Sequence, residues 1–267
     1  MLRSLAEPEG YRLHATDDEI GRCRDFLIDD QQWAVRYMVA DTRTWLPGRK
    51  VLVSPAQLGT PDWAAQRLPV AMTREQLEQS PPLDEDAPVS RRYEQAFNTA
   101  HGLPAYWLGS GLWGDYPAPS TMMAPQEMYI EPAPTVPEEP DTAEPVDPAV
   151  DDRVHLRSLR EITGYDVRAG GDGEAAKVGR LKDVIVDDER WAVRYLVVDT
   201  SRLPFSKQVL LPVELVTDVD WASRSVRTEA TEAQVEEAPA FDPAEPVNAR
   251  MEAVLYDYYG RAHARVG

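Results

Sequence analysis

Paired carboxylates are the residues of this chain whose types and spacing come nearest to a catalytic pattern. Asp29-Asp30 and Asp187-Asp188 each place two acids side by side, an arrangement suited to acid–base or metal chemistry. Adjacent residues of a strand point to opposite faces, however, so neither pair can easily share one substrate. An aspartate at the end of a strand also accepts hydrogen bonds from its own backbone and so begins a turn. We therefore predict turn roles for these acids, with a hydrolase that uses them as an alternative.

Thiol and imidazole groups are few. The chain has one cysteine, Cys23, and four histidines. No motif links a histidine to Cys23, and no two histidines have the spacing of metal ligands. We therefore expect no catalytic residue, no metal site and no cofactor. A single cysteine also allows no internal disulfide, which fits a reducing compartment.

Aromatic residues gather in one short stretch, at Tyr106, Trp107, Trp113 and Tyr116. Aromatic side chains dominate the binding energy of many protein interfaces, so one hypothesis is a docking patch for a protein partner. The other is that this stretch folds back onto the neighbouring domain. Both interpretations stay open at this point.

The elements that must position these residues occur twice. "WAVRYMVADT" from Trp33 returns as "WAVRYLVVDT" from Trp191, and the same register carries Gly21 to Gly179. Upstream, "RSL" at Arg3 recurs at Arg157 in a slightly shorter register. Such a match over several separated elements indicates a duplicated domain.

Within each unit, short alternating strands are the main signal. Apolar residues alternate over residues 33–40, where Trp33, like its copy Trp191, begins the predicted central strand. Similar short runs bounded by Gly, Asp or Pro predict a small, mainly antiparallel β-barrel. Cys23 corresponds to Leu181 in the second copy, which predicts a small buried hydrophobic residue rather than a nucleophile.

An acid lies inside a predicted strand in each copy. Asp25 and Asp183 occupy equivalent positions, and an arginine lies on the next strand of each hairpin. We predict that Asp25 pairs with Arg36, and Asp183 with Arg194, as structural ion pairs.

Short helices follow each set of strands. Thr73 with Gln76, and Thr231 with Gln234, form capping-box patterns in which side chain and backbone satisfy each other. Further helices are predicted after Ser90 and after Asn248, two suitable N-caps. The fold class is therefore mainly β with short helices, as two tandem small barrels that are each followed by helices.

The units are separated by a Pro-rich acidic stretch. We assign residues 1–108 to the first domain, 109–152 to a linker and 153–267 to the second domain. The linker composition cannot bury enough apolar surface to offset the entropy of ordering, so an extended chain is expected.

The repeated pattern resembles a known family. "LRSL" at Leu2, "GYRLHATDDEIGRCRDFLIDD" at Gly10, "WAVRYMVADT" at Trp33 and "KVLVSPAQL" at Lys50 are similar to the PRC-barrel family, which includes the cytoplasmic domain of the photosynthetic reaction-centre H subunit and the C-terminal domain of a ribosome maturation factor. The resemblance implies an adaptor barrel and supplies no catalytic motif. It covers most of both units.

The charge and hydropathy of the chain limit the classes of partner that it can bind. A net charge of -18 and a pI near 4.6 oppose nucleic-acid binding, and no apolar run is long enough to span a bilayer. We therefore expect a cytoplasmic, non-enzymatic interaction or scaffolding protein whose protein partners the sequence does not identify. The alternatives are a subunit or assembly partner of a photosynthetic or other electron-transfer membrane complex, a ribosome maturation adaptor, and the hydrolase.

The two barrels are also expected to contact each other. Ala34, Met38, Leu196 and Val198 lie on the face of the central strand that a lone barrel would turn outward. An internal pseudo-dimer, or a homo-oligomer, would cover them.

Overall fold

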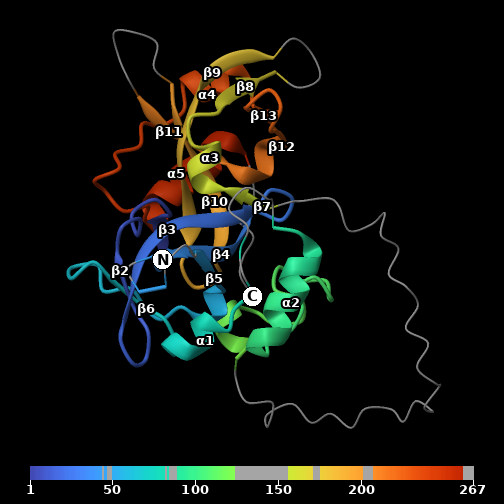
Figure 1. Ribbon diagram of the computed structural model, residues 1–267. Coiled ribbons are helices and arrows are strands. Elements are labelled where there is room, and N and C mark those ends of the chain that lie inside the picture. The colour runs from blue at the N-terminus through green and yellow to red at the C-terminus, as the bar shows by residue number, and fades with distance from the viewer. Residues whose placement is uncertain are drawn as a thin grey trace, which may run out of the picture.

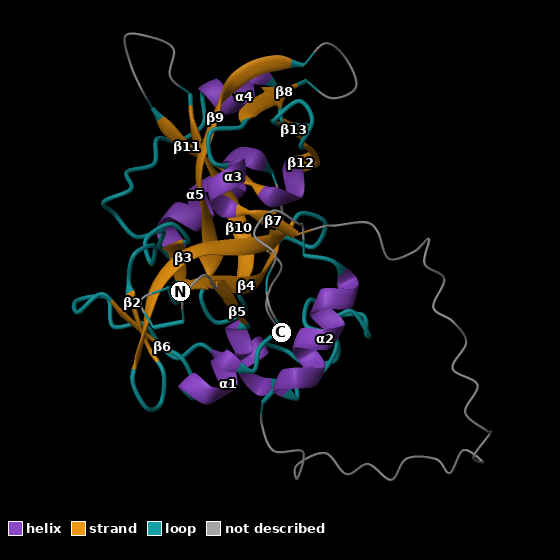
Figure 2. Ribbon diagram, viewed as in Figure 1, coloured by secondary structure: helices purple, strands orange, loops and turns teal. Residues whose placement is uncertain are grey.

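The computed structural model describes most of both units of the chain. The described residues are 1–43, 45–46, 50–81, 83, 89–123, 156–170, 175–200 and 207–260. The predicted linker from residue 124 onward lies outside them. The fold is mainly β, as the alternating pattern predicted, with short helices at its periphery (Figure 2).

Each unit contributes the same series of strands. The first contains β1 (Leu2–Ser4), β2 (Arg12–His14), β3 (Glu19–Asp29), β4 (Ala34–Asp41), β5 (Lys50–Val53) and β6 (Arg67–Pro69). The second contains β7 (Leu156–Ser158), β8 (Asp166–Ala169), β9 (Ala176–Asp187), β10 (Ala192–Asp199), β11 (Gln208–Pro212), β12 (Val216–Asp220) and β13 (Ser225–Thr228).

The strand order is the same in both units. In the first, β6-β2-β3-β4-β5 are neighbours, and in the second β13-β8-β9-β10-β11 repeat this order with β12 added at one edge. The pairs β2–β6 and β8–β13 are parallel, and the other pairs of each unit are antiparallel. The repeat in the sequence is therefore a repeat of topology.

The two units share one 13-stranded sheet among the described residues, because each lends its first strand to the other. β1 of the first unit pairs with β9 of the second, and β7 of the second pairs with β3 of the first (Figure 1). The registers match: Leu2 lies opposite Asp187, and its copy Leu156 lies opposite Asp29. The division at residues 1–108 and 153–267 therefore needs a correction, since β1 and β7 pair with the other unit.

The repeated tryptophans lie at the point where the units meet. Trp33 and Trp191 have φ of 54° and 52°, so each closes a turn in the left-handed region instead of beginning a strand as predicted. The carbonyl of Trp191 accepts a hydrogen bond from the amide of Val35 at 2.8 Å, and that of Trp33 accepts one from Val193 at 2.7 Å. This reciprocal pair explains why the "WAV" segment recurs: it joins the two units.

The apolar core runs through the junction. Met38, Leu196 and Val198 are fully buried in one cluster that contains residues of both units. Ala34 pairs with Ala192 across the junction. These residues are thus buried in a cluster to which both units contribute, and Ala34 meets its counterpart across the junction.

Four of the five described helices lie where the capping signals place them, and α3 (Leu159–Ile162) is an addition that the sequence did not predict. The five are α1 (Arg74–Glu78), α2 (Arg91–His101), α3, α4 (Glu232–Glu236) and α5 (Ala249–Tyr259), with 3-10 turns η1 (Pro55–Gln57), η2 (Pro119–Thr121) and η4 (Val213–Leu215). Thr73 and Thr231 form complete capping boxes, and Ser90 and Asn248 cap the two longer helices. These helix predictions are confirmed.

Candidate interaction site

Two polar contacts fasten each exchanged strand to the other unit. The hydroxyl of Ser158, on β7, donates to Asp25 Oδ2 at 2.5 Å, and the amide of Arg160 donates to Asp25 Oδ1 at 3.2 Å. In the other copy Asp183 accepts from the hydroxyl of Ser4 and from the amide of Ala6. We call these two equivalent contacts the Asp–Ser clasps.

The clasps correct the predicted ion pairs. Asp25 is bound to Ser158 and not to Arg36, and Asp183 is bound to Ser4 and not to Arg194. The acids keep a structural role, but their partners belong to the other unit. The recurring "RSL" at Arg3 and Arg157 contains both serines and is the sequence signal for the clasps.

The clasps predict how stability depends on pH. Burial raises the pKa of Asp25, Asp183 and Glu94 above the ordinary values of these carboxyls. A carboxyl with a raised folded-state pKa binds its proton more readily folded than unfolded, so its charge costs stability at pH 7, and that cost falls as the pH drops toward about 4. These three carboxyls should therefore contribute a rise in melting temperature as the pH falls from 7 toward about 4, opposite in sign to the contribution of the aspartates whose pKa is lowered, such as Asp41 and Asp166.

A matched variant isolates this contribution. Burial lowers the pKa of His101, so this group reduces stability on acidification. Because every variant retains His101, its effect cancels when the variants are compared. The double variant Asp25→Asn/Asp183→Asn should gain less, or lose more, in melting temperature than the wild type over the same pH range. A double variant that keeps the full slope of the wild type would contradict this account.

Arg36 is a buried cation held by polar groups on one side and aromatic rings on the other. Its guanidinium lies 3.1 Å from Asp29 Oδ2 and donates to the side-chain oxygen of Gln32 at 2.5 Å. Its Cζ lies 3.8 Å from the centre of the Tyr106 ring and 4.9 Å from that of Trp113. A guanidinium is planar and weakly hydrated, so it suits this sandwich between carboxylate and ring faces.

The rings belong to a segment that covers Arg36, residues 103–123, which we call the aromatic cover. The Tyr106 hydroxyl donates to Glu94 Oε1 at 2.6 Å and accepts from Arg91 at 3.0 Å, and both partners lie on α2. Leu112 contributes its carbonyl, which accepts from Arg36 at 2.5 Å. The helix therefore positions the start of the cover, and Arg36 holds its middle.

Trp113 ties the cover to the second unit. Its indole N–H donates to the carbonyl of Arg190 at 2.7 Å, and only 1% of the residue is exposed. Tyr106 is also buried, whereas Trp107 and Tyr116 are half-buried. Of the two interpretations of these aromatic residues, the structure supports folding back for Tyr106 and Trp113, which cannot be a free docking patch.

The start of the predicted linker is wrong for the same reason. Residues 109–123 pack onto the two units, with Trp113 and Met122 buried beside Tyr106. The Pro-rich composition suggested an extended chain, but the aromatic side chains bury enough surface to order this part. The remainder, 124–152, lies outside the described residues.

Trp113 should contribute strongly to stability. Trp113→Ala removes a fully buried ring, its hydrogen bond and a face of the Arg36 sandwich, so we expect the free energy of unfolding to fall by about 3–5 kcal/mol. Trp221, which is 54% exposed, is the matched control, and Trp221→Ala should cost about 1 kcal/mol or less. Urea unfolding followed by circular dichroism measures both, and similar losses would contradict the packing role of Trp113.

The equivalent surface of the second unit has no cover of its own, although the edge of the first unit's cover, at Gly111, Leu112, Tyr116 and Pro117, borders it. Arg194 is the counterpart of Arg36, yet it is half-buried and forms no hydrogen bond or ion pair among the described residues. It lines a pocket of about 500 Å³ together with Trp33, Tyr116 and Glu214. The same arginine is thus enclosed in one copy and open in the other.

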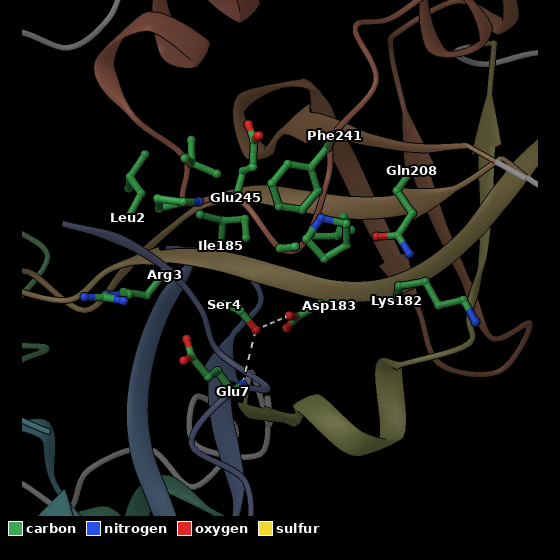
Figure 3. A pocket seen from close by; sticks show the side chains of 15 residues that line it. Leu2, Arg3, Ser4, Glu7, Lys182, Asp183, Ile185, Gln208, Phe241 and Glu245 are labelled. Atoms are coloured by element: carbon green, nitrogen blue, oxygen red, sulfur yellow. Dashed lines mark hydrogen bonds between the residues drawn. The ribbon is translucent and has the colours of Figure 1, made fainter. Parts of the chain in front are cut away.

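A second pocket, of about 600 Å³, lies beside the Ser4 clasp (Figure 3). Its wall includes Leu2, Ile185 and Phe241, and the Ser4–Asp183 hydrogen bond lies at its floor. In the first unit the counterparts of its apolar residues are packed against Phe97 in a closed cluster. The two copies therefore differ here as well.

The acid pairs serve the structure. Asp29 accepts from the amides of Gln31 and Gln32, and Asp187 accepts from those of Glu189 and Arg190, which are the predicted turn bonds. Their neighbours bind across the junction: Asp30 pairs with Arg157 at 2.6 Å, and Asp188 with the N-terminal amine.

Cys23 is buried, as expected of a core residue, and burial raises the pKa of its thiol. Within the part of the chain that the structure describes, no three His, Cys, Asp or Glu side chains lie close enough together to hold a metal ion. No described helix combines the length and apolar character that crossing a bilayer requires.

Comparison with known proteins identifies the repeated unit. The family model of the PRC-barrel domain matches residues 155–235, which run from β7 to α4. No curated protein matches the chain. The matched segment contains strands β7 to β13, and with them Asp183 of the clasp and Trp191 of the turn. The second unit, over residues 155–235, is therefore similar to the PRC-barrel domain family.

Proposed function

We propose that the protein is a non-enzymatic interaction or scaffolding protein of the cytoplasm, built from two tandem PRC-like barrels. The observation that carries the proposal is the reciprocal junction. Strands β1 and β7 are exchanged, and the clasps at Asp25 and Asp183 fasten them. This junction holds the two units in a fixed orientation. A rigid pair of units can present its surfaces to partner proteins in a constant arrangement.

The polar side chains that repeat between the copies support the same conclusion. Asp29, Asp187 and their neighbours are engaged in turns or in contacts across the junction. The clearest difference between the copies is on the surface, where one arginine is covered and its counterpart is open. A platform with two unlike faces can bind different partners on each.

Affinity purification of the tagged full chain from its native host tests this function. We expect one or more proteins to be recovered in fixed proportion, and to be absent when the junction is broken by Asp25→Ala/Asp183→Ala. Recovery of an electron-transfer membrane complex, or of ribosomal subunits, would assign the scaffold to that assembly. An enzymatic activity abolished by Asp29→Asn or Asp187→Asn, at unchanged melting temperature, would instead support a hydrolase.

A further inference from the structure

We propose that the open pocket beside Arg194 is a docking site for a tryptophan or tyrosine side chain presented by a loop of a partner protein. This inference rests on the proposed scaffolding function and gives it a site. The duplication itself shows what such a pocket accepts, because the equivalent position of the first unit is filled by the aromatic cover.

The pocket is built from the counterparts of the residues that hold the cover. In the first unit the aromatic rings pack against Arg36, Ala56 and Trp191. Arg194, Glu214 and Trp33 occupy the equivalent positions, and all three line the 500 Å³ pocket. The pseudo-symmetric relation of the two units therefore maps the seat of Trp113, and the guanidinium on which Tyr106 stacks, onto this cavity.

The chemistry of the pocket suits an aromatic side chain. The Arg194 guanidinium forms no hydrogen bond or ion pair with any described residue, so a ring face can stack on it as Tyr106 stacks on Arg36. Glu214, exposed where the first unit has Ala56, offers an acceptor for an indole N–H or a phenol O–H. Tyr116 and Trp33 supply apolar walls.

The helix equivalent to α2 differs from it in surface character. In the first unit Asn98 of α2 donates to the carbonyl of Pro104 in the cover. Its counterpart on α5 is Tyr256, which is 38% exposed, and Val254 of the same helix is 43% exposed. The exposed apolar side chain of Val254, on the helix equivalent to the one that holds the cover, favours an apolar loop around the anchoring ring.

The rest of this chain offers little to fill the pocket. Residues 260–267, which follow α5 as the cover follows α2, contain no Phe, Trp or Tyr, and Ala264 stands at the position equivalent to Tyr106. Elsewhere outside the described residues, the aromatic side chains are Tyr129 and Phe205. We therefore assign the pocket to a partner protein, with Tyr129 and a second copy of the chain as the outcomes that a test must separate.

A labelled peptide with the sequence of residues 103–117, LPAYWLGSGLWGDYP, is a direct probe. Fluorescence anisotropy with the full chain should show saturable binding, and Arg194→Ala should weaken that binding about tenfold. Arg180→Ala, at an exposed arginine of β9, is the control and should leave it unchanged. A peptide with alanine in place of Tyr106 and Trp113 should not bind.

Four results would overturn the proposal. They are no saturable binding up to millimolar peptide, binding that survives Arg194→Ala, peptide binding that strengthens markedly in Tyr129→Ala, and a concentration-dependent dimer in sedimentation that Arg194→Ala abolishes. The third assigns the pocket to the chain's own linker and the fourth to a second copy. Co-purification of partners that is unaffected by Arg194→Ala would leave the scaffolding function standing while this site fails.

Discussion

Replacing Arg36 with alanine should lower the free energy of unfolding by about 3–5 kcal/mol, because it leaves a buried acid without its cation. Asp29 is 6% exposed and would keep only its turn bonds to backbone amides. The carbonyl of Leu112 would lose its donor, and the rings of Tyr106 and Trp113 would lose the group between them and the sheet. Urea unfolding of the full chain measures the loss.

The duplication supplies the control. Arg194 stands at the same place in the second unit but is half-buried and makes no ion pair among the described residues, so Arg194→Ala should change the free energy of unfolding by about 0.5 kcal/mol or less. The double variant Arg36→Met/Asp29→Leu should recover part of the loss of Arg36→Ala, since it removes the buried charge as well. Equal costs for the two arginines would show that the cover does not set the energy of Arg36.

Elements fixed by local chemistry followed directly from the sequence. The capping boxes at Thr73 and Thr231 and the caps at Ser90 and Asn248 involve residues within one helical turn, so nothing distant can displace them. The turn roles of Asp29 and Asp187 depend on amides two or three residues ahead, and they too were predicted correctly.

The exchange of strands could not be predicted from the repeat. Strand β1 could pair with β3 of its own unit or with β9 of the other, and the two strands share the same pattern of residues. Because the sequence offers both pairings similar contacts, the choice depends on how the two units pack together. The partner of Asp25 depends on the same choice, because Ser158 lies on the exchanged strand β7, 133 residues away in the chain.

The sequence shows that residues 103–123 are rich in aromatic side chains, but it does not show whether these side chains pack against the chain itself or face a partner. Tyr106 and Trp113 marked residues 103–123 as unusual, yet a ring that docks a partner and a ring that packs inside the chain have the same sequence signature. What decides between them is the position of Arg36, which lies on a strand far from the cover in sequence.

The Asp–Ser clasps should carry the second large effect. Asp25→Ala removes the acceptor of the Ser158 hydroxyl and of the amides of Phe26 and Arg160 at the edge of the junction. Leaving a donor unsatisfied costs about 1–3 kcal/mol when it stays out of water. Because the contact to Arg160 is exposed and the variant also removes an unfavourable buried charge, a net loss of about 2–4 kcal/mol is expected. Asp183→Ala should cost a similar amount.

The matched variants separate hydrogen bonding from charge. Asp25→Asn keeps an acceptor for the two amides, so it should cost clearly less than Asp25→Ala at pH 7, where the buried charge is itself unfavourable. Asp218→Ala, at an exposed acid of β12, should change stability by about 0.5 kcal/mol or less. Because the clasps are related by the pseudo-twofold arrangement, a cost for Asp183→Ala far below that for Asp25→Ala would mean that only one exchanged strand depends on its clasp.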